Sequence, residues 1–264
     1  MVTVPFDYDA APERYRLGMH VTQTHSTVSL YDRVAAMLAE LGAGVVLDVG
    51  CADGVLRAAL PPSGPRLIGL DASATLLRTH PLPVVQADAA RLPFRDGSVD
   101  AVTALNVLYH LPYPLPALRE AHRVLRPGGH LLTAVIARND SPEFSAYWSR
   151  PATSFDAEDA PGHIRRVFDA VTVYPWDAPL VTLPDAAAIY DYLIGRQAPA
   201  TVADTAAREL PAPYASPSAA PSSAPPEASA TLRTFRRAIP YGTVGGARRH
   251  VASQVAALRE PFFY

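Results

Sequence analysis

The sequence predicts an α/β fold: a doubly wound, mostly parallel sheet with helices on both faces. Three observations support this class. Five short apolar runs between Val45 and Ile136 alternate with helical segments, as parallel strands and their crossover helices do. The first run closes on a loop of small residues from which a helix begins, and acidic residues stand where three of the runs end. Because ligands of such sheets bind at the carboxyl ends of the strands, the pattern also predicts where the site lies.

The segment VVLDVGCADG, residues 45–54, is the most informative part of the chain. Its apolar run suits a strand buried on both faces, and Gly50, Ala52 and Gly54 let the backbone approach a ligand with little or no side chain in between. The loop is not a dinucleotide fingerprint, because Val55 stands where the third glycine is needed. A phosphate loop with Gly-Lys-Ser/Thr is excluded, since all 23 basic residues are Arg.

Five more blocks extend the pattern in chain order. Residues 67–73 are predicted as a second strand ending in Asp71, which lies 17 residues beyond Gly54. The other blocks are a third short strand at the start of 84–93, followed by Asp88, a fourth strand in 99–111 that runs into a loop, an amphipathic helix over 116–130 stopped by Pro127-Gly128-Gly129, and a fifth strand over 131–136.

Together these blocks resemble the class I S-adenosylmethionine-dependent methyltransferases that act on small molecules, the methyltransferase type 11 or UbiE-like group. The loop is similar to that family's Asp-x-Gly-x-Gly-x-Gly, with Ala52 in place of the middle glycine, and the resemblance covers roughly residues 28–195. It implies a Rossmann-like sheet of seven strands in the order 3-2-1-4-5-7-6, an N-terminal helical lid, and S-adenosyl-L-methionine as cofactor.

The flanking regions complete the predicted organisation. Residues 27–41 form an amphipathic helix, capped by Ser26 or Thr27 and ended by Gly42, while a sixth strand over 167–174 and a helix over 184–195 follow the fifth strand. The predicted parts are an N-terminal lid and helix (1–43), a cofactor-binding domain (44–195), a flexible Pro/Ala/Ser-rich segment (196–230) and a C-terminal segment (231–264). The tail from Leu232 offers only a poor strand, so the origin of the seventh strand stays open.

The resemblance implies a set of residues that bind the methyl donor. The loop residues Gly50, Cys51, Ala52 and Gly54 are expected to hold the methionine part, and Asp48 to orient this loop or meet the donor's ammonium through water. Asp71 is expected to accept from the ribose hydroxyls and Asp88 from the adenine amino group, with Ala72 and the backbone at Ala89 against the adenine ring. The backbone near Leu105 and Asn106 is expected to approach the donor's amino acid end. Simpler roles remain for the acids: Asp48 and Asp71 can cap the helices that follow them, Asp88 can close a turn, and Cys51 can be only a small loop residue.

The candidates for catalysis lie at the mouth of the expected site. Tyr109 and His110 follow the fourth strand, and His20 belongs to the segment expected to cover the site, so each is a candidate for handling the acceptor's proton. The alternatives are structural packing for His110 and a solvated loop for His20. The aromatic residues Tyr15, Tyr109, Phe144, Tyr147 and Trp148, with no clustered positive charge, predict a small, largely apolar acceptor.

Composition narrows the class of protein further. The 264 residues carry a net charge of −2 with no basic run, which disfavours nucleic acid as a partner, and no apolar run reaches 18 residues, which disfavours a membrane span. One cysteine and the lack of a signal-peptide pattern predict a cytoplasmic protein, and the absence of Lys together with high Ala, Pro and Arg content predicts a bacterial source. No metal-ligand spacing is present, so no metal is expected. A non-catalytic S-adenosylmethionine-binding protein is the alternative function, and the oligomeric state is left open.

Overall fold

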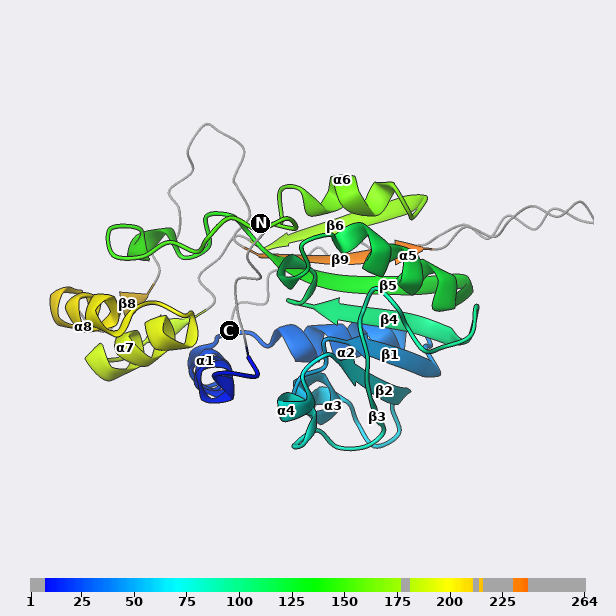
Figure 1. The fold of residues 1–264 in the computed structure, drawn as a ribbon, viewed down its shortest axis with the longest axis horizontal. Helices are drawn as coiled ribbons and strands as arrows, with labels where there is room; N and C mark the ends of the chain where they lie inside the picture. The colour runs from blue at the N-terminus through cyan, green and yellow to red at the C-terminus, as the bar shows by residue number, and fades with distance from the viewer. Residues whose placement is uncertain (1–7, 177–180, 211–213, 216–229, 237–264) are drawn as a thin grey trace, which may run out of the picture.

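The structure, a computed structural model, describes residues 8–176, 181–210, 214–215 and 230–236. Its centre is a seven-stranded sheet in the order β3-β2-β1-β4-β5-β9-β6. The strands are β1 (Val45–Val49), β2 (Arg66–Asp71), β3 (Val84–Gln86), β4 (Val99–Leu105), β5 (Leu125–Ile136), β6 (Ala170–Trp176) and β9 (Ala230–Arg236). β1 to β5 pair in parallel, whereas β9 runs antiparallel to both of its neighbours (Figure 1).

β9 occupies the place expected for the seventh strand, between the fifth and the sixth. Its register joins Ala230 to Ile136 of β5 and to Trp176 of β6. No clear sequence signal marks this strand, because a short alternating segment next to a Pro/Ala/Ser-rich region is specified by its two neighbours rather than by its own composition. The mostly parallel α/β class predicted from the sequence is confirmed.

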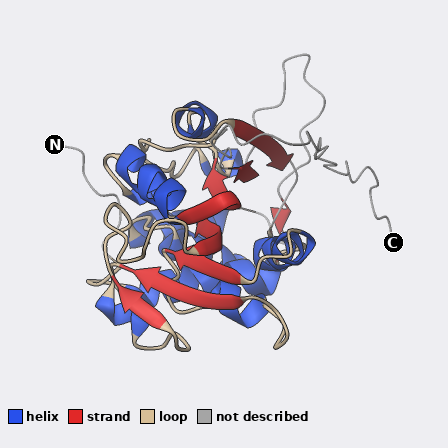
Figure 2. Cartoon of the chain, turned by 90° about the vertical axis from the view of Figure 1, so that its right-hand side faces the viewer, coloured by secondary structure: helices blue, strands red, loops and turns tan. Residues whose placement is uncertain are grey.

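Helices cover both faces of the sheet (Figure 2). The described helices are α1 (Pro12–His25), α2 (Leu30–Glu40), α3 (Val55–Ala59), α4 (Ala74–Leu77), α5 (Pro114–Val124), α6 (Ala160–Arg165), α7 (Ala186–Gly195) and α8 (Ala200–Glu209), with short turns η1 (Leu108–His110) and η2 (Pro142–Phe144). Among these residues, no helix combines the length and the apolar character that a membrane crossing requires.

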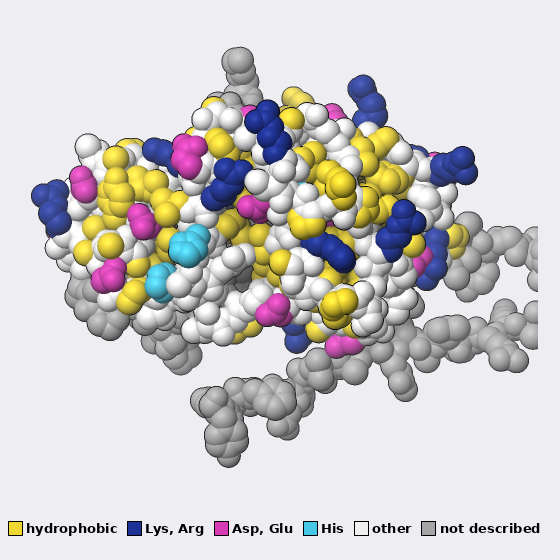
Figure 3. Space-filling view, turned by 90° about the horizontal axis from the view of Figure 1, so that it is seen from below, with side chains coloured by type: hydrophobic (Ala, Val, Ile, Leu, Met, Phe, Trp, Pro, Cys, Tyr) yellow, Lys and Arg dark blue, Asp and Glu magenta, His cyan; other side chains and the backbone are white. Residues whose placement is uncertain are grey.

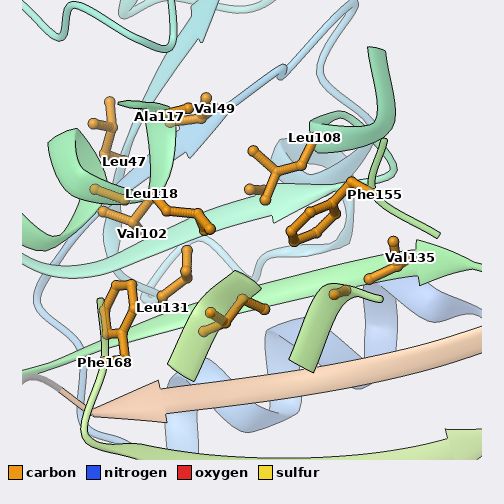
Figure 4. Close-up of a cluster of buried hydrophobic side chains, with 14 of the residues drawn as sticks. Leu47, Val49, Val102, Leu108, Ala117, Leu118, Leu131, Val135, Phe155 and Phe168 are labelled. Carbon is orange, nitrogen blue, oxygen red and sulfur yellow. The ribbon is translucent and has the colours of Figure 1, made fainter. Parts of the chain in front are cut away.

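The sheet is buried on both faces because alternate residues of each strand enter different cores. Leu47 of β1 packs in a cluster with Leu118 of α5 and Ile164 of α6, whereas its neighbour Val46 packs with Leu38 of α2 on the opposite face. Figure 4 shows the first of these clusters between the sheet and its covering helices. The near-continuous apolar runs in the sequence therefore arise because helices cover both faces of the sheet.

A third group of helices covers one end of the sheet. α1, α7 and α8 lie together at the left of Figure 1, beside the end toward which β4 points. Val21 of α1, Ile189 of α7 and Ala203 of α8 belong to one buried cluster. α1 and α7 approach backbone to backbone, since a Cβ added at Gly195 would lie 2.7 Å from the backbone nitrogen of Gly18. We call α1, α7 and α8 the cap.

Several predicted boundaries are wrong, for local reasons. α2 begins later than expected because Ser29, whose Oγ accepts from the Asp32 N–H at 3.1 Å, is its cap. The helix predicted over 116–130 is α5, which ends at Val124, and β5 starts at Leu125 because that residue already pairs with Val99 of β4.

The predicted flexible segment also differs from expectation. α1, in contrast, lies inside the predicted N-terminal lid, and Val21 is its one buried residue. Residues 200–209 form α8 inside the segment 196–230 that was expected to be flexible, because small Ala203 and Ala206 pack closely in the cap cluster. The expectation of flexibility for 211–230 falls largely outside the described residues.

Candidate functional site

A cavity of about 870 Å³ opens at the carboxyl ends of the parallel strands. Its wall includes residues that follow β1, β2, β3, β4 and β5, together with residues of α1, α2 and the cap helix α7. The volume is in the range of sites that enclose small molecules. Of the residues predicted to bind the donor or to act in catalysis, all line this cavity except Gly54 and His20.

The loop after β1 has a backbone that requires small residues. Gly50 has φ +73°, and a Cβ there would lie 2.6 Å from Cβ of Val107. The N–H groups of Gly50 and Cys51 both donate to the carbonyl oxygen of Leu70, at 2.7 and 3.1 Å. Ala52, which replaces the family's glycine, also has a positive φ of 47°, a conformation that costs a non-glycine residue about 1 kcal/mol.

Asp71 ties this loop to the second strand. Its Oδ2 accepts from the Ala52 N–H at 2.9 Å, and its Oδ1 accepts from the Ser73 N–H at 2.8 Å. It is not the cap of α4, because Ser73 caps that helix by accepting from the Leu76 N–H at 3.1 Å. Each carboxylate oxygen keeps a free lone pair direction, so the group can still accept from two adjacent hydroxyls of a ligand.

The other two predicted acids have different surroundings. Asp48 is buried, and its Oδ1 accepts from Oγ1 of Thr103 at 2.6 Å. Burial raises its pKa to about 7, against the opposing effect of the Thr103 hydrogen bond. It does not cap α3, whose N-cap is Gly54. Asp88 is exposed, and its Oδ1 accepts from the Ala90 N–H at 2.8 Å. This is the contact expected if Asp88 only closes a turn.

Gly54 serves the loop rather than the cavity wall. It has φ +96°, and a Cβ there would lie 2.9 Å from Cδ of Pro81. Ala72, Ala89, Leu105 and Asn106 all belong to the cavity wall. Cys51 also lines the wall, and burial raises the pKa of its thiol, so the thiol is uncharged and suits a role as a small loop residue.

Tyr109 and His110 lie together in the wall, on the turn η1. Their rings are 4.2 Å apart, and the ring of Tyr8 meets His110 edge to face at 5.2 Å. Burial lowers the pKa of His110 to about 4, with a smaller contribution from Arg150, and burial raises the pKa of Tyr109 to about 12. At neutral pH the imidazole is therefore uncharged and the phenol is protonated.

His20 is not brought to this site. It is exposed on α1 and is not part of the cavity wall, because the face of α1 toward the cavity carries Tyr15, Met19 and Thr22 instead. The hydroxyl of Tyr15 donates to Asp53 at 3.4 Å. The position of His20 matches its simpler alternative, a solvated histidine.

The expected aromatic pocket divides into two groups. Tyr15, Tyr109 and Trp148 line the cavity. Phe144 instead packs in the cap cluster, with its ring 5.6 Å from that of Tyr192, and Tyr147 points away to donate to Glu209 at 3.1 Å. Both lie outside the cavity wall, against the cap cluster.

Sequence reasoning missed two arginines in the wall. Arg150 and Arg196 line the cavity, Arg196 as an ion pair with Asp140. They correct the expectation that this surface holds no clustered positive charge. Arg196 follows α7 and Arg150 lies in a long irregular segment, so neither has a local motif.

The wall fits S-adenosylmethionine where the resemblance expects it. The glycine cradle that a Cβ at Gly50 would fill, the free acceptor capacity of Asp71, and the backbone after β4 all face one continuous cavity. Within the described residues, no group of three or more His, Cys, Asp or Glu side chains is placed to hold a metal ion.

A known protein family matches the central part of the chain. The family described as "Methyltransferase domain" matches residues 47–133, which span β1 to β5. With the topology and the loop geometry, this match shows that the chain contains a methyltransferase domain with the class I fold, and S-adenosylmethionine is the cofactor that such a domain implies.

Individual proteins are similar in sequence to part of the chain. An uncharacterised 37.1 kDa protein in a transposon of Streptomyces fradiae is 44% identical over 98 residues, which are 33% of this chain and 28% of that protein. A ubiquinone biosynthesis O-methyltransferase of Pseudomonas paraeruginosa is 33% identical over 38% of this chain and 48% of its own length. The chain thus spans about half or less of these relatives.

Solved structures share the fold over most of the chain. A possible histamine N-methyltransferase of Thermotoga maritima has a TM-score of 0.58 at 16% identity, covering 87% of this chain and 98% of its own. The cyclase SpnF has a TM-score of 0.55 at 18% identity over 88% of this chain and 94% of its own. Because one neighbour is a cyclase, the shared fold alone does not fix a reaction.

Proposed function

We propose that this chain is an S-adenosylmethionine-dependent methyltransferase whose acceptor is a small, largely apolar molecule. The observation that carries the proposal is one cavity that continues from the donor loop to the aromatic wall around Tyr109 and Trp148. A donor and an acceptor bound there lie side by side, and placing the acceptor against the donor's methyl group is most of what this transfer needs.

We call the part of the cavity assigned to S-adenosylmethionine the donor half, and it is formed by the loop after β1 and the predicted acids. Bound S-adenosylmethionine supplies an electrophilic methyl group on a sulfonium. Asp71 accepts from the ribose hydroxyls while its bonds to Ala52 and Ser73 hold the loop. Asp88 accepts from the adenine amino group. Asp48, buried beside Thr103, supports the loop and responds to the donor's positive charge.

The acceptor half is assigned to the wall formed after β4. The neutral imidazole of His110 can accept a proton from an acceptor hydroxyl or amine, and the protonated hydroxyl of Tyr109 can donate a hydrogen bond to the acceptor. The low pKa makes His110 a weak base, so positioning, more than proton transfer, is expected to dominate the rate.

A non-catalytic donor-binding protein is the second candidate. It stays open because the fold by itself does not fix an activity. The two candidates differ in the acceptor half alone: a binder needs the donor loop, whereas an enzyme also needs room beside the methyl group. The continuous cavity favours the enzyme.

The proposal is tested by calorimetry with S-adenosylhomocysteine and by transfer of a labelled methyl group to a panel of small phenols and amines. Gly50→Ala should abolish donor binding, because its Cβ overlaps Val107. Gly128→Ala is the matched control: it has a similar φ of +80° but nothing within 4 Å of the added carbon. Failure of the unaltered chain to bind S-adenosylhomocysteine refutes the proposal, and binding without transfer to any acceptor supports the non-catalytic candidate.

Charge distribution and the single thiol support two further parts of the proposal. Arg side chains on the face shown in Figure 3 are distributed among acidic and hydrophobic ones, which does not favour a nucleic acid partner. A cytoplasmic location is proposed because Cys51, the one cysteine, is buried as a free thiol.

A further inference from the structure

Arg150 has hydrogen-bonding capacity that the described residues do not use. Its Nη2 donates to Oδ1 of Asp156 at 2.6 Å and to the carbonyl oxygen of Ala137 at 3.0 Å. Its Nε and Nη1 are buried and have no partner among the described residues. The side chain is 3% exposed. A buried guanidinium with donors unsatisfied on two of its three nitrogens is costly, and a structure that keeps one gains when an acceptor group arrives.

The position of Arg150 places this capacity in the acceptor half of the cavity. Ala137, to which it is anchored, follows β5 directly, so the guanidinium lies at the carboxyl end of that strand. Arg150 is part of the cavity wall, and its guanidinium carbon lies 5.6 Å from the centre of the Tyr109 ring. The donor acids Asp71 and Asp88 follow β2 and β3, on the other side of β1 in the sheet.

The two arginines of the wall are each paired with one acid, but only one of these acids lines the cavity. Asp140 lines the cavity but is paired with Arg196, which lies over the Tyr192 ring. Asp156, the partner of Arg150, is fully buried outside the wall. It is also shared, since it accepts from Oγ1 of Thr153 at 2.5 Å.

Neighbouring groups respond to the same field. The charge of Arg150 adds to burial in lowering the pKa of His110. It also opposes, together with Arg196, the rise that burial causes in the pKa of Tyr109. An anionic group accepts stronger hydrogen bonds from the unused donors of Arg150 than a neutral group does.

Resting on the methyltransferase function proposed above, we propose that the acceptor carries a carboxylate, and that Arg150 binds it and thereby selects the acceptor. The acceptor is then an amphiphilic acid, with an apolar body against Tyr109 and Trp148 and its carboxylate at the carboxyl end of β5. Charge-assisted hydrogen bonds to Nε or Nη1 give the selectivity, because an uncharged isostere makes weaker ones.

The test compares matched acids and amides on the full chain saturated with S-adenosylhomocysteine. The probe pairs are benzoate with benzamide, phenylacetate with phenylacetamide, and cinnamate with cinnamamide, each measured by ligand-observed NMR. The acids should bind about tenfold more tightly than their amides or better. The Nε–H signal of Arg150 in protein labelled with ¹⁵N-arginine should shift with the acids and not with the amides.

Two variants separate recognition from support of the fold. Arg150→Gln combined with Asp156→Asn removes the guanidinium without leaving a buried carboxylate unpaired, and it should abolish the preference for acids. Arg138→Gln is the matched control, because Arg138 also contacts Asp156, at 3.3 Å, but lies outside the cavity wall. It should keep the preference.

The inference is overturned if the acids bind no better than the amides, whether both bind or neither does, or if the Arg150 signal is unmoved. The comparison within the unaltered chain decides the matter even if the double variant does not fold. If the unaltered chain does not bind S-adenosylhomocysteine, the proposed function itself is contradicted. Failure of the carboxylate inference and failure of the proposed function are therefore distinguishable.

Discussion

In the donor half, Asp71 is expected to determine the affinity for S-adenosylhomocysteine, and Asp48 the pH dependence of stability. Asp71 accepts from the Ala52 and Ser73 N–H groups and is assigned the ribose hydroxyls. Asp71→Ala should weaken S-adenosylhomocysteine binding by roughly 2 kcal/mol, because charge-assisted hydrogen bonds are lost. Asp71→Asn, which keeps one acceptor oxygen, should weaken it less. Calorimetry gives both values, and unchanged affinity in a folded Asp71→Ala variant contradicts the ribose assignment.

Asp48 makes the stability of the free protein depend on pH. Its folded pKa of about 7 is above the ordinary carboxyl value of 3.8 because of burial. The folded state therefore binds the proton more tightly, and this contribution to stability is fully present below about pH 4 and is lost as the pH rises through about 7. Asp48→Asn should flatten the pH dependence of the melting temperature in that window.

Thr103→Val provides the matched comparison for this second prediction. It removes the hydroxyl that donates to the ionised Asp48, so the pKa of Asp48 should rise further and the loss of stability should extend to higher pH. Calorimetric melting across the range from acid to mildly alkaline pH measures both variants. If the Asp48→Asn variant keeps the same pH dependence of melting as the unaltered chain, the titrating group lies elsewhere.

Among the elements, the packing of α1 on α7 determines how the cap closes the cavity. Gly18 and Gly195 both line it, and a Cβ at Gly195 would lie 2.7 Å from the backbone nitrogen of Gly18. Gly195→Ala should force the two helices apart and destabilise the cap by about 1–3 kcal/mol. Gly162→Ala is the control, because it lies in α6 with nothing within 4 Å, and it should be neutral or slightly stabilising. Hydrogen exchange of α1 amides reports the difference, and equal protection in the two variants would count against close packing of the cap.

For the molecule as a whole, β9 is the strand that joins β6 to the rest of the sheet. It pairs with β5 from His130 to Ile136 and with β6 from Ala170 to Trp176. A chain ending at residue 229 lacks β9, so β5 becomes an edge strand and β6, already at the edge, loses its partner in the sheet. This truncation should lower the melting temperature well below that of a chain ending at residue 236. Similar melting temperatures for the two truncations would show that β9 contributes little.

Local sequence signals were sufficient for the sheet class, the donor loop and the acids after β1, β2 and β3. A strand buried on both faces is a continuous apolar run, and a positive φ at Gly50 and Gly54 favours a residue without a Cβ. The same signals, with the family resemblance, indicated the residues of the donor half, and all of these except Gly54 line one cavity.

The acceptor half, in contrast, depends on tertiary packing. β9 forms because β5 and β6 flank it, α8 because Ala203 and Ala206 fit the cap cluster, and the wall contains Arg150 and Arg196 because distant segments fold over the carboxyl end of β5. Such contacts join residues far apart in the chain, so no periodicity or local motif reports them. The donor loop presents its own backbone to a ligand, whereas the acceptor wall exists only once these separate segments have packed together.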